Sequence, residues 1–220
     1  MEAYESIKMR RSIRAFRLEP ISKEVMQKIL IAAGNSPSYT NTQPWEMMIV
    51  SGKKREVLSE ELLKLAKNKA PKSPDIPFPT SWLPLMEKYS REHGARRLEV
   101  LGIDRNDKKG RENLRLMNFE FYGAPCAVFL FMDQSLGEWS LYDMGLFTQN
   151  LILAAHSLGV GSCIQASVAE YANEIKEFLK ISKDKKLVIC ISMGYPDLEA
   201  KLNHYQSLKK DLHDYVKWYE

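Results

Sequence analysis

Residues 126–158 read CAVFLFMDQSLGEWSLYDMGLFTQNLILAAHSL, and this stretch decides the fold class of the chain. Its first seven residues follow Pro125 and form an uninterrupted apolar run, which predicts a strand buried on both faces. From Ser140 to Leu158, apolar residues recur at helical spacing and extend far round the helix, so we expect this helix to be buried at a domain or subunit core. A buried strand followed by such a helix indicates that helices and strands share one core.

Helices and strands continue on both sides of this stretch. Apolar spacing predicts helices over residues 2–10, 22–34, 53–70 and 169–180, and strands over residues 46–50 and 186–194. The second of these helices has Ser22 at its start, where a serine side chain can cap the helix. Because the sequence contains no internal repeat and no clear domain boundary, we expect a single α+β domain over residues 1–220.

The middle of the chain, residues 70–121, differs in composition from its surroundings. Five prolines lie between residues 71 and 84, and no helix or strand tolerates that density. Residues 85–121 are charged and contain helical stretches. We expect residues 70–121 to form a lid-like insertion, because long loops in compact domains are often functional.

The tail, residues 197–220, is polar but retains large apolar side chains such as Tyr205, Leu212 and Trp218. A disordered tail would not carry so many apolar groups. We therefore expect it to pack against another surface, such as that of a partner subunit.

Composition and charge are those of a soluble globular protein. The net charge is only +4, from 32 basic against 28 acidic residues, which argues against binding of nucleic acid. The N-terminus lacks the apolar stretch of a signal peptide, and no run is long enough to cross a membrane, so we expect a cytoplasmic protein. Cys126, Cys163 and Cys190 lie in apolar surroundings without metal-site spacing, so we expect buried free thiols and no metal site.

The first candidate binding site is an arginine cluster formed by Arg10, Arg11, Ser12 and Arg14. It places three guanidinium groups and a hydroxyl directly after a predicted helix. Arginine donates hydrogen bonds in a planar fork that suits a phosphate or the carbonyl edge of a ring. The alternative for this cluster alone is a solvated surface run.

The second candidate is an amide loop, PSYTNTQPW, in which Pro37, Ser38, Asn41 and Gln43 precede a predicted strand. Side-chain amides both donate and accept hydrogen bonds, so they can bind the edge of a heterocycle. The alternative is a turn whose polar groups satisfy one another.

The third candidate is the sequence GVGSCIQA, residues 159–166, which follows the long apolar helix. Its small residues would let the backbone approach a ligand closely and point N–H groups at it. The alternative is a helix cap followed by a buried strand.

The order of these motifs resembles that of the flavin-dependent nitroreductase family: RRSxR, SxxNxQPW, a glycine-flanked turn after a long apolar helix, and GYPD at Gly194–Asp197. The resemblance runs from about Tyr4 to Asp197 and is weakest in the middle of the chain. It implies an α+β sandwich in which helices flank a central mixed or antiparallel sheet. It also implies an intertwined homodimer with FMN at each of the two subunit interfaces. The long helix would then lie in the dimer core, and the tail would embrace the partner.

The resemblance also implies which residues bind FMN. The arginine cluster matches the residues that divide between the FMN phosphate and the N1/C2 carbonyl edge of the flavin. Family members often place a further cation from the tail on the phosphate; Lys209 is the best match, with His204 or Lys210 as alternatives.

Other matching positions approach the ring system. The amide loop matches the segment that reaches the isoalloxazine and ribityl chain, partly from the other subunit. Gln165 and Ala166 fall where backbone N–H groups face flavin N5. Trp45, Tyr39 and Phe121 could line a substrate pocket, although core packing is the alternative for at least two of them.

The activity that follows from this resemblance is an FMN-dependent oxidoreductase reaction. Hydride would pass from NAD(P)H through flavin N5 to a nitroaromatic or quinone-type acceptor by a ping-pong mechanism, without an obligatory acid–base side chain. Asp143 and His156 are unsuited as a catalytic pair, because they lie thirteen residues apart on different faces of one helix. The alternatives are reductive dehalogenation or another flavin-dependent reaction on the same fold, and, more remotely, a non-enzymatic basic binding module.

Overall fold

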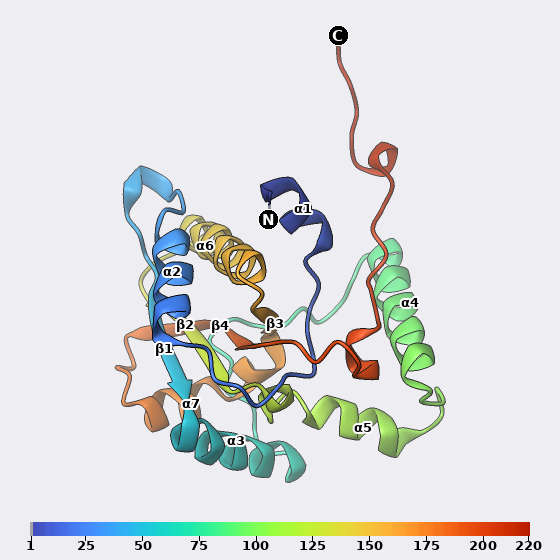
Figure 1. Ribbon diagram of the computed structural model, residues 1–220, viewed down its shortest axis with the longest axis horizontal. Coiled ribbons are helices and arrows are strands. Elements are labelled where there is room, and N and C mark those ends of the chain that lie inside the picture. The colour runs from blue at the N-terminus through green and yellow to red at the C-terminus, as the bar shows by residue number, and fades with distance from the viewer. Residues whose placement is uncertain (1) are drawn as a thin grey trace.

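The computed structural model describes residues 2–220 and is built round a four-stranded antiparallel sheet (Figure 1). The strands lie in the order β1-β2-β4-β3. Their bounds are β1 Glu46–Ser51, β2 Cys126–Asp133, β3 Gly161–Gln165 and β4 Lys185–Gly194. The α+β class expected from the sequence is confirmed, and the sheet is of the antiparallel kind.

Strand β2 pairs with a neighbour on each side and is buried on both faces, as its unbroken apolar sequence predicts. Its alternate residues enter two separate cores. Phe129 and Phe131 belong to one cluster, and Val128 and Leu130 belong to the other. Because side chains alternate across a strand, a single apolar run supplies both cores.

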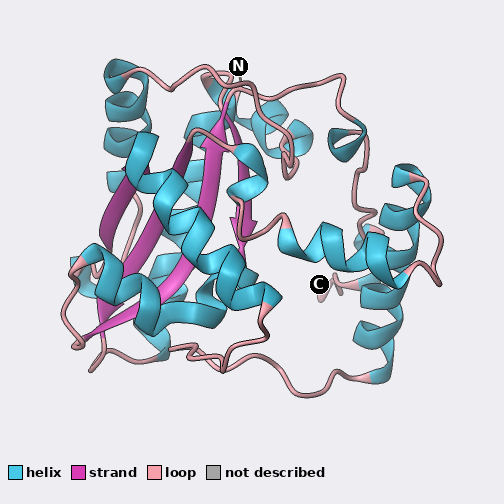
Figure 2. Ribbon diagram, turned by 90° about the horizontal axis from the view of Figure 1, so that it is seen from below, coloured by secondary structure: helices cyan, strands magenta, loops and turns pink. Residues whose placement is uncertain are grey.

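Two helical layers cover the sheet (Figure 2). On one face, α2 (Lys23–Gly34) and α6 (Glu138–Ser157) bury Ile29 and Leu151 against β2 and β4. On the other face, α3 (Gly52–Lys67) and α7 (Ala172–Leu179) complete a cluster that includes Leu58, Leu62 and Ile175. The expected start of the helix at residue 169 was wrong, since residues Ala166–Tyr171 wind as a 3-10 helix before α7 begins.

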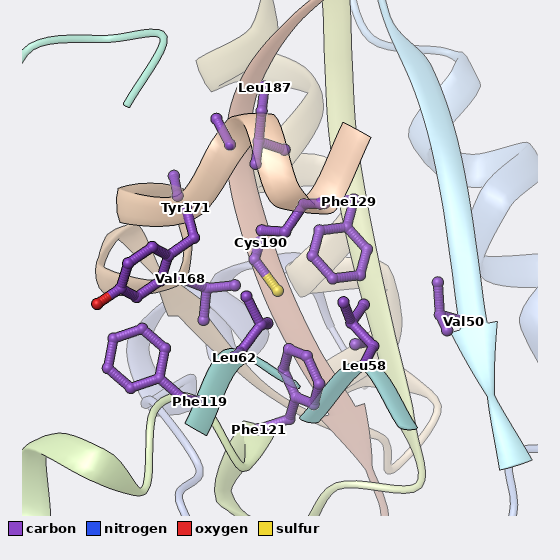
Figure 3. Packing of buried hydrophobic residues seen from close by; sticks show 14 of the residues in the cluster. Val50, Leu58, Leu62, Phe119, Phe121, Phe129, Val168, Tyr171, Leu187 and Cys190 are labelled. Carbon is purple, nitrogen blue, oxygen red and sulfur yellow. The ribbon is translucent and has the colours of Figure 1, made fainter. Parts of the chain in front are cut away.

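Figure 3 shows the core between the sheet and α3, in which Phe119 packs against Tyr171 and Phe121 packs against Phe129. Phe119 and Phe121 have no exposed surface, although they close the middle section of the chain. Trp45 stacks on Phe147 with ring centroids 4.7 Å apart, so both Phe121 and Trp45 serve the core.

The middle section is anchored at its first residues and then extends away from the sheet. Asp75 pairs with the buried Lys176 at 2.7 Å and accepts a hydrogen bond from the backbone N–H of Leu187 at 2.7 Å. Beyond this anchor come α4 (Pro84–Leu101) and α5 (Lys108–Leu116), and neither helix has a fully buried residue. Helix α4 stands apart from the sheet in both views.

The N-terminal helix α1 (Ala3–Met9) contacts α6, and the C-terminal tail runs past α4 (Figure 1). Within the tail, Tyr205 is buried, whereas Tyr215 and Trp218 are exposed. Short 3-10 helices lie at Tyr39–Asn41, Phe121–Gly123, Lys201–Asn203 and Leu212–Asp214. Across residues 2–220, every helix is too short or too polar to cross a membrane.

Candidate functional site

The arginine cluster lies on a segment that runs beside β3. Ser12 forms a parallel bridge with Ser162, and the backbone N–H of Ile13 donates to the carbonyl of Ser162 at 2.9 Å. Gly161 permits this approach, because a Cβ added there would lie 2.8 Å from Ile13 Cγ1. The third motif, GVGSCIQA at residues 159–166, begins just after the cap of the preceding helix with Gly159, whose φ is +77°. It then continues as strand β3.

Asn203 fastens this segment to the tail. Its side-chain oxygen accepts from the backbone N–H of Arg14 at 2.6 Å, and its amide donates to the carbonyls of Ala15 at 2.8 Å and Asp197 at 2.6 Å. Asn203 is fully buried, and it was missed in the sequence because a lone asparagine in a polar tail has no distinguishing pattern. It brings residues 10–14 and the tail to one place.

The arginine cluster and the tail together line a pocket of 160 Å³. Arg10, Arg11, Ser12 and Arg14 share this pocket with Lys209, so the structure brings these five candidates together. The other lining residues are Lys8, Met9, His93, Tyr205, Gln206 and Ser207.

The pocket is cationic and contains no carboxylate among its lining residues. Within residues 2–220, no ion pair connects Arg10, Arg11, Arg14 or Lys209 to an acidic side chain. Four cations gathered without counter-ions repel one another and favour an anion between them. The donor set therefore fits a phosphate group, which accepts several charge-assisted hydrogen bonds.

A larger pocket of 560 Å³ lies between α3 and α7. Glu61, Glu174 and Glu177 line it together with Lys64, so its charge does not suit a phosphate. The cationic pocket, although smaller, has the chemistry of an anion site.

Of the three tail candidates, Lys209 is the one that lines the cationic pocket. Lys210 instead lies 5.0 Å from the centre of the Tyr89 ring, on the side of α4. His204 is exposed and is absent from the residues that line the pocket.

His93 of α4 also lines the pocket and forms a hydrogen bond between its Nδ1 and the hydroxyl of Tyr205 at 2.8 Å. Burial lowers the pKa of His93, and the nearby charges of Arg14, Arg97 and Lys209 lower it further. Sequence reasoning missed this residue, because it lies in the charged middle section far from the other pocket residues along the chain.

The amide loop lies elsewhere, at the N-terminal part of α6. The backbone N–H of Tyr39 donates to both carboxylate oxygens of Asp143, at 3.1 and 3.2 Å. Ser38 accepts from the backbone N–H of Gln43 at 3.0 Å, and Gln43 donates to the carbonyl of Asn41 at 3.3 Å. Some polar groups of the loop thus form hydrogen bonds with one another, as in the self-satisfied turn that was the alternative for this motif. The outer side chains of the loop remain exposed.

The backbone of this loop is held in an unusual conformation. Thr40, Asn41 and Gln43 have φ values of 47°, 60° and 48°, in the left-handed region that residues other than glycine seldom adopt. Such strain is maintained only when the surroundings hold it in place. Here the Asp143 carboxylate and the stacking of Tyr39 on Trp139, with centroids 5.8 Å apart, support the loop.

Helix α6 separates the amide loop from the arginine cluster. Asp143 contacts the loop, whereas His156 lies near Arg10 and Arg11, whose charges add to burial in lowering the pKa of His156. Thirteen residues of helix span about 20 Å. Within one chain, therefore, Pro37, Ser38, Asn41 and Gln43 do not join the cationic pocket. Asp143 and His156 are likewise too far apart to form a catalytic pair.

Gln165 and Ala166 lie at the end of β3. The Gln165 side chain is buried, donates to the carbonyl of Asn118 at 2.9 Å and accepts from the hydroxyl of Ser192. The Gln165 side chain is therefore directed into the core by Asn118 and Ser192. Ala166 is exposed, so a ligand could approach it from solvent.

All three cysteines are free and buried. Burial raises the pKa of Cys126 to about 12 and also raises the pKa values of Cys163 and Cys190. These thiols are therefore protonated and unreactive at neutral pH. In the part of the chain that the structure describes, no group of His, Cys, Asp or Glu side chains could hold a metal ion.

The sandwich of helices round an antiparallel sheet, with a cationic pocket beside β3, defines an α+β protein with an anion site. Residues 7–195 match the model of the Nitroreductase family, and the chain belongs to it.

Individual relatives resemble the chain over most of its length. It is 34% identical to a 4-nitrobenzoate reductase of Pseudomonas putida over 88% of this chain and 85% of the relative. It is 33% identical to the nitroreductase NfnB of Mycolicibacterium smegmatis, over 90% of this chain and 84% of the relative. A crystal structure of FMN-dependent NfnB from Mycobacterium smegmatis in complex with NADPH superimposes with a TM-score of 0.95 at 31% identity, covering 99% of this chain and 98% of the other.

Proposed function

We propose that this protein is an FMN-dependent reductase that oxidises NAD(P)H and reduces nitroaromatic or quinone-type acceptors. The observation that carries the proposal is the cationic pocket, in which Arg10, Arg11, Arg14 and Lys209 gather without a counter-ion on a fold that superimposes on an FMN-dependent nitroreductase. Two relatives named as reductases of nitroaromatic compounds are 34% and 31% identical to the chain, whereas an iodotyrosine deiodinase that also matches the whole chain is 24% identical. This favours nitro reduction over dehalogenation.

In this proposal the residues of the chain bind and orient the cofactor. Arg10, Arg14 and Lys209 would hold the phosphate, and Ser12 and Arg11 would extend the contacts toward the flavin ring. The flavin, when bound, supplies the redox chemistry by accepting hydride from NAD(P)H and passing it to the acceptor in a ping-pong sequence. An arginine of this cluster that lay near flavin N1 would favour the reduced, negatively charged form of the bound cofactor.

Backbone groups at Gln165 and Ala166 are the proposed neighbours of flavin N5. The Gln165 side chain is turned into the core and held by Asn118 and Ser192, which keeps the backbone at this turn in place. We assign no side chain as an acid–base catalyst, and solvent water supplies the protons.

The complete site requires a homodimer. In one subunit, the amide loop and the arginine cluster lie at opposite parts of α6, so a single chain presents two incomplete halves. If a second subunit packs against α6, its amide loop can meet the arginine cluster of the first. Pro37, Ser38, Asn41 and Gln43 would then approach the flavin from the partner.

Exposed apolar residues support this dimer. Helix α6 buries one side against α2 and the sheet, whereas Tyr142 on its outer side is 63% exposed. The tail carries Trp218 at 78% exposure and Tyr215 at 66%, and it extends away from the body of the subunit (Figure 1). Large apolar groups gathered in this way mark interaction surfaces. In the dimer, residues 197–220 would pack on the partner.

The middle section, residues 70–121, is the proposed lid over the acceptor. Its base is anchored by Asp75 and its end by Phe119, so the mobile part would be confined to α4 and the residues that flank it. Trp82 and Met86 there are exposed and apolar, as contacts for an aromatic acceptor require. The buried free thiols agree with the reducing environment of the cytoplasm, where we expect the protein to act.

The test begins with the visible spectrum of the purified protein. We expect a yellow protein that releases FMN on heating, at about one flavin per chain. NADPH or NADH should bleach the flavin, and 4-nitrobenzoate or a quinone should restore its colour. A colourless protein that does not take up added FMN would overturn the proposal. A flavin that is reduced but passes electrons to neither acceptor would overturn the acceptor class alone.

A further inference from the structure

We propose that His93 of α4 is a phosphate-binding residue of the cofactor pocket and that it takes up a proton when the FMN phosphate binds. This inference rests on the proposed function, because it requires that FMN is the ligand. His93 lines the same pocket as Arg14 and Lys209, and it reaches that pocket from the middle section of the chain. It would therefore connect α4 to the bound cofactor.

The contact with Tyr205 determines which ring nitrogen faces the phosphate. Nδ1 lies 2.8 Å from the Tyr205 hydroxyl, and the two rings meet edge to face with centroids 5.1 Å apart. In the neutral ring, the tautomer that carries its proton on Nε2 accepts at Nδ1 from the Tyr205 hydroxyl. In the charged ring, Nδ1 donates to the hydroxyl oxygen and Nε2 still carries a proton. In this tautomer and in the charged ring, Nε2–H can donate to a phosphate oxygen.

The groups that surround His93 keep it neutral before a ligand binds. Arg14 faces it from the N-terminal segment, Arg97 from α4 and Lys209 from the tail. Burial lowers its pKa most, and these three charges lower it further. On its other side, His93 shares a second pocket with the acidic Glu92, Asp211 and Asp214. The basic Arg96 and Lys210 line that pocket too, and the net effect of the surroundings still lowers the pKa of His93.

A bound phosphate changes the sign of the local charge. It introduces negative charge next to an imidazole that was surrounded by cations, and a neighbouring negative charge raises the pKa of histidine. The pKa of His93 is therefore higher with FMN bound than without it. A group whose pKa rises on binding takes up a proton, so affinity increases as the pH falls from above the bound-state pKa toward the free-state pKa.

The phosphate itself complicates this dependence, because its second pKa is near 6 and its charge falls in the same range. The effect of His93 must therefore be measured as a difference between the wild type and a variant. His93→Gln suits this purpose, since glutamine retains an N–H donor but does not titrate. His204→Gln is the matched control, because His204 is also a histidine, lies in the tail and does not line the pocket.

The decisive experiment measures the FMN dissociation constant of both variants and the wild type from about pH 8 to pH 6, a range that spans an ordinary histidine pKa. We expect the ratio of wild-type to His93→Gln affinity to increase toward low pH, by up to about tenfold per pH unit. His204→Gln should follow the wild type. Wild-type and His93→Gln curves that stay parallel would overturn the inference.

A second measurement does not depend on the variant folding. The NMR signal of the His93 ring in the wild type reports its pKa without ligand, with FMN and with riboflavin, which lacks the phosphate. We expect FMN to raise this pKa and riboflavin to leave it unchanged. An unchanged pKa with FMN bound would refute the role of His93. A wild-type protein that binds no flavin would instead refute the proposed function.

Discussion

At the scale of single residues, Asn203 is the buried connection on which the cationic pocket depends. Its three hydrogen bonds reach the backbones of Arg14, Ala15 and Asp197, and none of its surface is exposed. A side-chain amide can make these bonds because it donates and accepts at once. The residue contributes no charge to the pocket, yet it determines where Arg14 and the tail meet.

We expect Asn203→Ala to lower the free energy of unfolding by about 2–4 kcal/mol, because it leaves buried backbone groups without partners. FMN affinity should fall as well, since the tail and the N-terminal segment would separate. Urea unfolding and flavin titration measure the two effects. An unchanged midpoint of unfolding would show that water replaces the amide at this position.

Arg14, in contrast to Asn203, is expected to act on FMN binding through the charge of its side chain. Its guanidinium lines the pocket, whereas its backbone N–H holds Asn203, so Arg14→Ala removes only the charged group. A charge-assisted contact with phosphate contributes about 1.5–3 kcal/mol, and we expect FMN affinity to fall roughly ten- to a hundredfold. Flavin fluorescence during titration measures this loss.

Arg17→Ala is the control for Arg14→Ala. Arg17 lies three residues further along the same segment, is exposed and does not line the pocket. We expect it to retain wild-type affinity for FMN. Equal losses in both variants would indicate a general effect of net charge rather than a phosphate contact at Arg14.

At the scale of elements, the contact between β3 and the N-terminal segment positions the arginine cluster. A Cβ at Gly161 would lie 2.8 Å from Ile13 Cγ1, so the two backbones approach this closely only because residue 161 is glycine. We expect Gly161→Ala to destabilise the fold by about 1–3 kcal/mol through overpacking. It should also weaken FMN binding, since Ser12 and Arg14 flank the displaced Ile13.

Gly34→Ala provides the comparison within the same fold. Gly34 is the last residue of α2, and a Cβ added there meets no atom within 4 Å. Alanine is the better helix former, so stability should be unchanged or rise slightly. Thermal unfolding of both variants should show a lower midpoint for Gly161→Ala and an unchanged or slightly higher midpoint for Gly34→Ala. A neutral Gly161→Ala would mean that Ile13 can rotate away without moving the segment.

At the scale of the whole molecule, the proposed site combines the arginine cluster of one subunit with the amide loop of the other. Two defective variants, Arg14→Ala and Asn41→Asp, should then restore activity when they are co-expressed. Each mixed dimer would contain one intact site and one doubly defective site, so random pairing yields about one quarter of wild-type activity. Asn41→Asp suits the left-handed backbone at that position, because aspartate tolerates it.

The control is the double variant that carries both changes in one chain, which should stay inactive at any concentration. Sedimentation should show particles of twice the mass of the chain. Activity no greater than that of the separate single variants would contradict the two-subunit site, as would a monomer that retains FMN.

Much of this fold could be predicted from local patterns. The apolar run at residues 126–132 and the helical spacing at residues 140–158 depend only on the periodicity of each element, and both elements are confirmed. The helix expected from residue 169 begins three residues later, because apolar spacing does not distinguish a 3-10 turn from the first turn of an α-helix. The composition of the arginine cluster and its place after α1 were also evident from the sequence.

By itself, therefore, the sequence determined the kinds of elements, the buried cysteines and, through its motif order, the family. Only the tertiary structure decided that Lys209, rather than His204 or Lys210, joins the arginine cluster, that His93 lines the same pocket, and that Asn203 fastens the tail beside it. It also showed that α6 holds the amide loop apart from that pocket within one chain. The reason is physical: periodicity records which face of an element is buried, whereas the meeting of distant segments depends on how whole elements pack against one another.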